Sequence, residues 1–221
     1  MFNKFIRYVG KNFGNPNGIG GKISTKIMNV INQKQYKTVL ENIESKDTVL
    51  DIGFGNGYLI EKLFKNKNPI IYGIEISKDM LEKVKERNVG KIGNGSLKLS
   101  LEDISKTSFR SDTFDKVYTV NTVYFWKEPD KCFTEIKRIL KQNGVFLNVI
   151  YTKEYLDKIV YTKYGFNKFS LEELEQLTVE NGMNLIKTIE IQKNKSYCII
   201  SGMGRSISLE SSNRPFAASP I

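Results

Sequence analysis

A glycine-rich segment, Asp51-Ile-Gly53-Phe-Gly55-Asn-Gly57, directly follows the apolar run Thr48–Leu50. Glycine tolerates positive φ and lets a ligand approach the backbone, and a helix starting here would offer free N–H groups. A dinucleotide fingerprint needs its third glycine at position 58, which is Tyr58, and no Lys-Ser/Thr pair follows to make a P-loop. The GxGxG spacing, with an acid two residues before it, therefore predicts a ligand site different from both.

Three polar residues close later apolar runs and are candidates for the same site. Glu75 ends the run 69–77, Asp103 follows the run 96–101, and Asn121 ends the run 114–121. Ligands of parallel α/β sheets bind at the carboxyl ends of the strands, beside a topological switch point. We expect these side chains to meet there, although Asp51 alone could cap a turn and Asp103 alone could be a surface acid.

The elements that must position these residues alternate along the chain. Apolar runs predict five strands, and periodic apolar positions predict helices between them. Ser77 should cap the second helix, Ser170 and Glu173 form a capping box, and Asn143-Gly144 should end the helix opened by Pro129. The runs 184–192 and 195–201 should pair as a hairpin. We predict an α/β fold: a doubly wound, seven-stranded, mostly parallel Rossmann-like sheet with a C-terminal antiparallel hairpin. The strands are expected at 48–53, 69–77, 96–101, 114–121 and 145–151, and the helices at 24–43, 56–64, 78–87, 129–142 and 170–181.

The segment VLDIGFGNGYL resembles the first motif of class I S-adenosylmethionine-dependent methyltransferases, and the resemblance extends over about residues 47–151, most closely to the small-molecule, quinone-biosynthesis-like group. It implies that the glycine segment surrounds the methionine part of S-adenosylmethionine. It further implies that Glu75, with Ile76, holds the ribose, that Asp103 and Ile104 hold the adenine, and that Asn121 stands beside the amino group. The implied cofactor-binding set is Asp51, Gly53, Phe54, Gly55, Asn56, Gly57, Glu75, Ile76, Asp103, Ile104 and Asn121.

Aromatic residues cluster where the substrate pocket of this family opens. Tyr124, Phe125 and Trp126 follow the fourth strand, and Tyr151 ends the fifth. Aromatic faces attract cations and would suit the positive sulfur or an aromatic acceptor. We expect Tyr124, Trp126 and Tyr151 to contact the substrate, and Phe125 to be a core residue. The chain contains no histidine, so where the acceptor must lose a proton the candidate catalytic bases are Tyr124, Tyr8 or Tyr151, or a carboxylate that the sequence does not identify.

The N-terminal segment has an amphipathic pattern, with Phe2, Phe5, Ile6, Val9 and Phe13 near one helical face. Such a basic amphipathic helix either packs across the domain as a lid or lies on a membrane surface, and packing is the commoner fate. The Gly- and Asn-rich segment 13–22 follows it. We expect residues 1–46 to form N-terminal helices with a lid-like segment, residues 47–203 the methyltransferase domain, and residues 204–221 a disordered or artificially appended tail.

The bulk composition narrows the classes of function. The net charge of +10 allows an RNA partner, but the basic residues are spread among acids along the 221-residue chain. Two distant cysteines and no membrane-length apolar run indicate a cytoplasmic protein without a disulfide framework or metal site. We predict methyl transfer to a small-molecule acceptor by in-line displacement. The alternatives are an RNA methyltransferase, a non-catalytic donor-binding regulatory domain and, third, a nicotinamide oxidoreductase.

Overall fold

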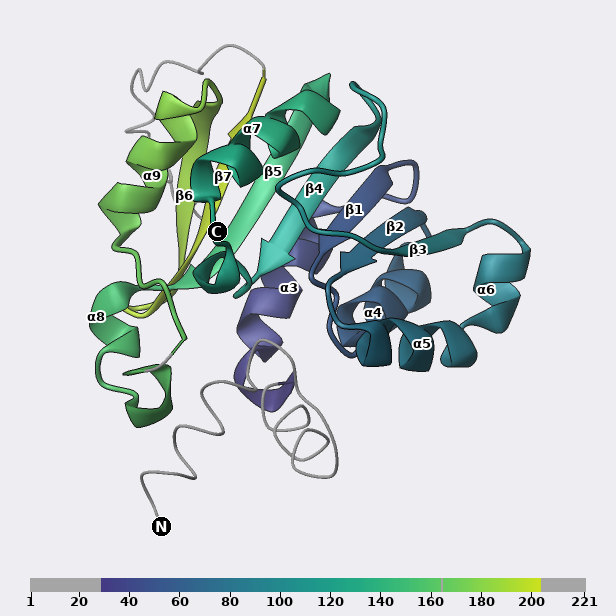
Figure 1. Ribbon diagram of the computed structural model, residues 1–221, viewed down its shortest axis with the longest axis horizontal. Coiled ribbons are helices and arrows are strands. Elements are labelled where there is room, and N and C mark those ends of the chain that lie inside the picture. Colours follow the sequence, from purple (N-terminus) through teal and green to yellow (C-terminus); the bar gives the residue numbers. More distant parts are fainter. Residues whose placement is uncertain (1–28, 164, 204–221) are drawn as a thin grey trace, which may run out of the picture.

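The computed structural model describes residues 29–163 and 165–203 and places their strands in one seven-stranded sheet, in the order β3-β2-β1-β4-β5-β7-β6 (Figure 1). Strands β1 to β5 run parallel, while β7 pairs antiparallel with both β5 and β6. The predicted sheet and C-terminal hairpin are therefore confirmed. The strands are β1 Thr48–Ile52, β2 Ile70–Glu75, β3 Leu97–Leu101, β4 Phe114–Val120, β5 Leu140–Tyr151, β6 Asn184–Gln192 and β7 Ser196–Gly202.

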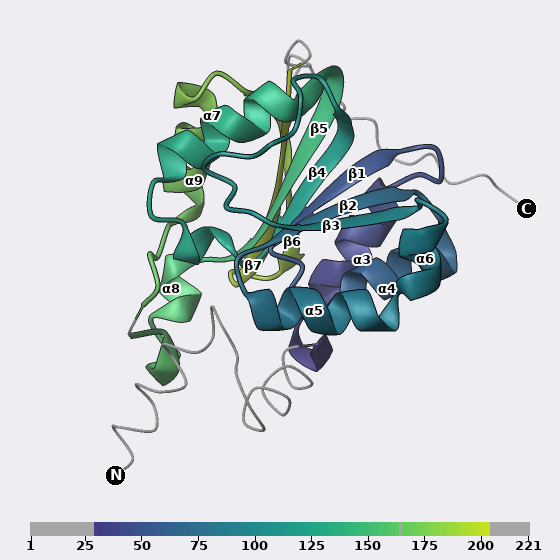
Figure 2. The same ribbon diagram turned by 45° about the vertical axis from the view of Figure 1, so that its right-hand side comes forward.

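Helices cover both faces of the sheet (Figure 2). One apolar cluster joins the sheet to α3, α4 and α5, with Val39, Ile60 and Val84 fully buried. The other joins it to α7 and α9 through residues such as Phe133 and Leu174. The helices are α3 Gln33–Asn42, α4 Tyr58–Asn66, α5 Lys78–Arg87, α6 Val89–Gly93, α7 Pro129–Ile139, α8 Lys153–Leu156 and α9 Leu171–Glu180, and the 3-10 helices are η1 Val123–Phe125 and η2 Val160–Lys163.

Helix starts follow the local signals in the sequence. The Ser77 side chain accepts a hydrogen bond from the Met80 N–H at the start of α5. Ser170 and Glu173 form the predicted capping box of α9, each accepting from the backbone N–H of the other. These contacts satisfy backbone donors that have no partner inside the helix. The first turn of each of these two helices therefore begins at a defined residue.

The predicted boundary between α7 and β5 is wrong. The helix ends at Ile139 rather than at Asn143-Gly144, and β5 begins at Leu140. Leu140 pairs with Phe114, and the register shifts between Phe114 and Lys116. A Cβ on Gly144 would lie 2.9 Å from the Phe114 carbonyl oxygen, so this glycine permits close packing of two strands. Long-range pairing outweighs the turn signal of the Asn-Gly pair here.

Four short helices, α6, α8, η1 and η2, were not predicted, and the helix expected at 24–43 is described as α3 only over Gln33–Asn42. Their brief sequences carry too few periodic positions to be recognised. The amphipathic N-terminal segment with Tyr8, the segment 13–22 and the C-terminal tail lie outside the described residues. Within the described ranges, no helix is long and apolar enough to span a membrane.

Candidate functional site

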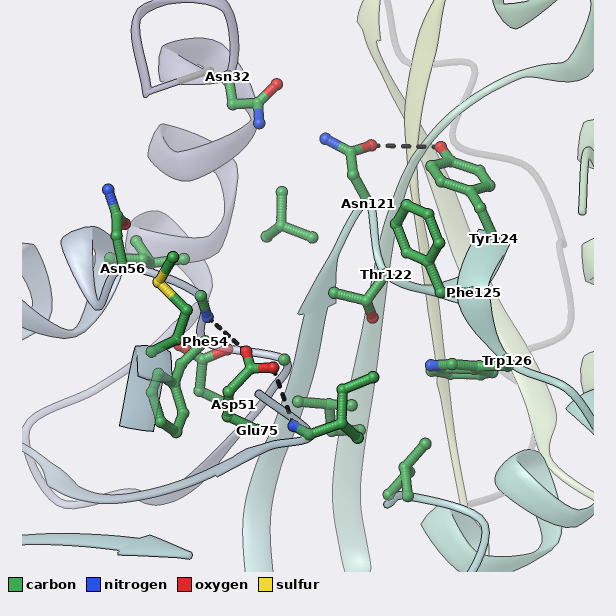
Figure 3. Close-up of a pocket in the computed structure, with 18 of the residues that line it drawn as sticks. Asn32, Asp51, Phe54, Asn56, Glu75, Asn121, Thr122, Tyr124, Phe125 and Trp126 are labelled. Atoms are coloured by element: carbon green, nitrogen blue, oxygen red, sulfur yellow. Dashed lines mark hydrogen bonds between the residues drawn. The ribbon is translucent and has the colours of Figure 1, made fainter. Parts of the chain in front are cut away.

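A cavity of about 250 Å³ opens at the carboxyl ends of β1, β2 and β4, beside the point where the strand order reverses (Figure 3). Except for Gly57 and the undescribed Tyr8, it brings together every residue predicted for the site. These are Asp51, Gly53, Phe54, Gly55, Asn56, Glu75, Ile76, Asp103, Ile104, Asn121, Tyr124, Trp126 and Tyr151. Gly57 lies just behind the cavity as the N-cap of α4.

The glycine turn between β1 and α4 has left-handed backbone at three positions. Gly53 has φ +71°, and a Cβ there would lie 2.7 Å from Thr122 Cγ2. Gly55 has φ +53°, and an added Cβ would meet nothing within 4 Å. Gly53 therefore permits close packing of the turn against Thr122, just before η1, whereas Gly55 leaves room on the side that lines the cavity.

Glu75 fastens the end of β2 to this turn. One carboxylate oxygen accepts the Gly55 N–H at 2.9 Å, and the other accepts the N–H groups of Ile76 and Ser77, each at 2.9 Å. Burial raises the pKa of Glu75, while these three hydrogen bonds act to lower it. A carboxylate offers about four lone-pair sites, so capacity remains for a ligand hydroxyl. Ile76, by contrast, is exposed.

Asp51 lies buried at the end of β1 and accepts a hydrogen bond from the Tyr118 hydroxyl at 2.7 Å. Burial is the largest cause that raises its pKa, to about 7, while the Tyr118 hydrogen bond lowers it and the nearby Glu75 raises it. Among the described residues, one hydrogen-bond donor contacts the Asp51 carboxyl group, whereas three contact that of Glu75. The Asp51 carboxyl group therefore changes charge near neutral pH.

Asp103 and Ile104 lie on the loop after β3. Ile104 is buried and lines the cavity, where its side chain can pack against a flat ring. Asp103 is exposed, and its Oδ1 accepts the Ser105 N–H at 2.8 Å. The Asp103 side chain therefore also shapes its own turn, and it borders the cavity without being buried in it.

Asn121 follows β4 in a left-handed conformation, with φ +59°. Its Nδ2 donates to Gln35 Oε1 at 2.7 Å, and Gln35 on α3 is fully buried. Gln35 was not predicted as a site residue. The sequence does carry a signal for it. Gln35 lies four positions before the buried Val39, on the inward side of the same helix, and a polar residue there indicates a buried polar contact.

The Tyr124 hydroxyl is held by the backbone of Tyr151 and by the side chain of Asn121, whose Oδ1 lies 3.2 Å away. It donates to the Tyr151 carbonyl oxygen at 2.8 Å and accepts the Tyr151 N–H. Burial raises the pKa of Tyr124 well above its usual value. These contacts argue against the predicted role of Tyr124 as a base, because its hydroxyl holds its proton and serves β5 instead. The prediction for Phe125 is also wrong: Tyr124 and Trp126 are buried, and Phe125 is the more exposed of the three.

A segment after β5 forms a wall that the sequence analysis missed. Its cavity-lining residues are Tyr155, Leu156, Ile159, Thr162 and Phe166. The Phe166 ring lies 4.8 Å from that of Phe125, and the Tyr151 and Tyr155 rings are 5.0 Å apart. Asn167 fastens this segment to η1, since its N–H donates to the Tyr124 carbonyl and its Nδ2 to the Trp126 carbonyl, both at 2.8 Å. No motif marks these residues, because only the tertiary fold brings them to the site.

The charge of the cavity is opposite to that of the chain. The whole chain carries a net charge of +10, yet no Lys or Arg is found among the described residues that line the cavity. Its charged lining residues are all acidic: Asp51, Glu75, Glu102 and Asp103. They lie on the half of the cavity formed by β1, β2 and the loop after β3. That half favours a ligand with positive charge and several hydroxyl or amino donors.

Comparison with known proteins identifies the domain. Residues 50–148 match the family model described as "Methyltransferase domain". A Bacillus subtilis (strain 168) protein named "Uncharacterized methyltransferase YdaC" is 31% identical over 99 residues, which are 44% of this chain and 52% of that protein. This chain therefore matches about half the length of that relative.

Solved structures share the fold. The PH0226 protein of Pyrococcus horikoshii OT3 superposes with a TM-score of 0.68 at 19% identity, covering 86% of this chain and 94% of that one. The geranyl diphosphate C-methyltransferase of Streptomyces coelicolor A3(2), solved with Mg²⁺, geranyl diphosphate and S-adenosyl-L-homocysteine, has a TM-score of 0.66 at 12% identity, covering 77% of this chain and 80% of that one. With the glycine turn, these findings show that residues 50–148 match a methyltransferase domain and that the chain shares the fold of the two solved structures.

Proposed function

We propose that this protein transfers a methyl group from S-adenosylmethionine to a small-molecule acceptor by in-line displacement. The observation that carries the proposal is the lining beside the glycine turn, which is acidic and, within the described residues, has no Lys or Arg, in a chain of net charge +10. A lining of this kind suits a donor with a positive sulfur, an amino group and a ribose diol.

The residues of the chain divide the work of holding the donor. Glu75 has acceptor capacity for the ribose hydroxyls, with Ile76 beside it, and Ile104 and Asp103 border the place for the adenine. The turn from Asp51 to Gly57, including Phe54 and Asn56, surrounds the methionine part, with Asn121 near its amino group. When bound, S-adenosylmethionine supplies a methyl group on a positive sulfur. The electron pair of the acceptor forms the new bond to the methyl carbon, and the sulfur keeps the electron pair of the bond that breaks.

The remaining contribution of the protein is alignment and exclusion of water. The aromatic wall around Tyr124, Trp126 and Tyr151 encloses the side of the cavity opposite the acids. We assign Tyr124 to positioning, because its hydroxyl joins η1 to β5. Tyr8 remains a predicted base outside the described residues. An RNA methyltransferase is less well supported, since phosphate binding relies on Lys and Arg, which the described lining lacks.

Calorimetric titration of the full chain with S-adenosylmethionine, S-adenosylhomocysteine and NADH tests the proposal. We expect both adenosyl ligands to bind at one site and NADH not to bind. Glu75→Gln should weaken binding by about 10- to 100-fold, as expected for loss of a charged hydrogen bond. The control Glu61→Gln, an exposed glutamate on α4 that does not line the cavity, should bind as the wild type does.

Preferential binding of NADH, or no binding of either adenosyl ligand, would overturn the proposal. Formation of S-adenosylhomocysteine from S-adenosylmethionine in the presence of acceptor candidates separates an enzyme from a donor-binding regulatory domain. A regulatory domain would bind both ligands but would form no S-adenosylhomocysteine from S-adenosylmethionine with any acceptor.

A further inference from the structure

The cavity has two halves of different chemistry (Figure 3). The first, beside the glycine turn, contains all four carboxylates of the lining. The second, the acceptor wall, is formed by η1, the end of β5 and the segment up to Phe166, and it carries no charged side chain among the described residues. The acceptor wall consists of Tyr124, Phe125, Trp126, Tyr151, Tyr155, Leu156, Ile159, Thr162 and Phe166.

Most polar atoms of the acceptor wall are already hydrogen-bonded within the protein. The Thr162 hydroxyl donates to backbone carbonyls, with the Ile159 oxygen at 2.8 Å. The Tyr124 hydroxyl bonds to the backbone of Tyr151, whose own hydroxyl lies 3.3 Å from Asn32 Oδ1. The Trp126 indole nitrogen faces the cavity in Figure 3. The wall thus offers an incoming molecule an apolar surface with few polar contacts.

Burial energetics separate the kinds of acceptor that this wall can hold. Moving apolar surface out of water is favourable by about 25 cal/mol per Å². Burying a phosphate or carboxylate against a wall without a counter-charge is strongly unfavourable, and the acidic half of the cavity across from the wall would repel it further. The aromatic faces of the wall would attract a cationic acceptor, but its charge would then lie beside the positive sulfur of the donor and be repelled by it. Only an uncharged, apolar molecule avoids both the cost of burying an unpaired charge and electrostatic repulsion inside the cavity.

We infer that the methyl acceptor is an uncharged, largely apolar small molecule held by the acceptor wall, and not a phosphorylated or nucleic-acid substrate. The inference rests on the proposed function, because it assigns the half of the cavity that the donor leaves open. It differs from the acceptor named for the Streptomyces coelicolor enzyme, geranyl diphosphate, which carries a charged diphosphate.

Competition between matched ligands tests the inference. The full chain, saturated with S-adenosylhomocysteine, is titrated with the neutral fluorescent probe N-phenyl-1-naphthylamine. Geraniol and geranyl diphosphate, which share one hydrocarbon chain, are then compared as displacers, together with a short single-stranded RNA. We expect geraniol to displace the probe at a concentration at least about tenfold lower than geranyl diphosphate, and RNA not to displace it.

Variants locate the probe. Phe125→Lys and Ile159→Ala should each weaken probe binding by about tenfold. Val160→Ala is the matched control for Ile159→Ala, because Val160 is the next residue, 52% exposed and absent from the lining. Unchanged affinity for S-adenosylhomocysteine in each variant shows that the donor half remains folded.

The outcomes separate the two claims. If S-adenosylhomocysteine binds but geranyl diphosphate or RNA displaces the probe better than geraniol, the inference is wrong and the proposed function stands. Equal effects of Ile159→Ala and Val160→Ala would also contradict the inference, since the probe would then bind elsewhere. Failure of S-adenosylhomocysteine to bind would overturn the proposed function, and the inference with it.

Discussion

Asp51 and Glu75 end adjacent parallel strands and are both buried, but they differ in the donors that surround them. Glu75 accepts three backbone N–H groups, whereas Asp51 accepts one phenolic hydroxyl, that of Tyr118. Hydrogen bonds to a carboxylate favour its charged form, and burial disfavours it. Asp51 is therefore the acid whose charge state responds to pH near neutrality.

The raised pKa of Asp51 predicts a pH-dependent stability. Its pKa is about 7 in the folded chain, against an ordinary value of 3.8. Between about pH 4 and 7 the folded chain holds a proton that the unfolded chain has released, so the free energy of unfolding decreases as pH rises through this window. Asp51→Asn, which retains an acceptor for Tyr118, should make that decrease shallower in denaturant titrations at several pH values.

Asp112→Asn is the matched control. Asp112 is exposed and has φ +54°, a conformation that Asn also adopts readily. The free energy of unfolding of Asp112→Asn should depend on pH as that of the wild type does. An Asp51→Asn protein with the full wild-type slope would show that Asp51 does not retain its proton in the folded chain.

Site residues that lie at the ends of strands could be predicted from the sequence. Asp51, Glu75 and Asn121 each end a strand, and parallel strand ends must meet at one edge of the sheet. Gln35 and Phe166 reach the cavity region from segments distant in sequence, through contacts with Asn121 and Phe125. Periodicity reports which residues are buried but not which partner they meet, so these two were not predicted.

The whole turn between β1 and α4, rather than one of its residues, forms the part of the cavity proposed to bind the methyl donor. Gly53→Ala would combine left-handed strain of about 1–2 kcal/mol with overpacking of about 1–3 kcal/mol against Thr122, and should lower the free energy of unfolding by their sum. Gly55→Ala has the strain alone, because nothing lies within 4 Å of its added Cβ. Its methyl group borders the cavity and should weaken S-adenosylhomocysteine binding about tenfold.

Gly95→Ala is the control for Gly55→Ala. It has φ +78° and equally open surroundings, but it does not line the cavity. Denaturant and calorimetric titrations should therefore give similar stability losses for both variants and weaker ligand binding only for Gly55→Ala. Equal ligand affinities for the two would contradict the placement of the methionine part beside Gly55.

Helix α3 reaches the site through Tyr36, which lines the cavity, and through the amide pair of Gln35 and Asn121. Gln35 does not line the cavity, so Gln35→Leu should weaken S-adenosylhomocysteine binding only by releasing Asn121. In a double-mutant cycle with Asn121→Gly, which keeps the left-handed backbone, we expect a coupling energy of about 1 kcal/mol in ligand binding. Thr38→Val, on the same helix with its hydroxyl bonded to Lys34, should leave affinity unchanged. Additive losses in the cycle would instead give Gln35 a merely structural role.

Across the whole molecule, positive charge and the acidic cavity are separated. The lysines that produce the net charge of +10 do not line the cavity within the described residues. The sheet order and hairpin followed from the alternation of apolar runs, because each strand and helix carries its own pattern. The boundary at Leu140 and the acceptor wall did not follow, since pairing with Phe114 and packing after β5 decide them.

A crystal structure of the full chain with S-adenosylhomocysteine tests the central claim most directly. We expect the ribose hydroxyls within hydrogen-bond distance of Glu75, the adenine against Ile104, and the sulfur facing the acceptor wall at Tyr124 and Trp126. A ligand bound elsewhere, or one with its sulfur directed away from that wall, would contradict the account, because the two halves of the cavity would then not meet at a reacting methyl group.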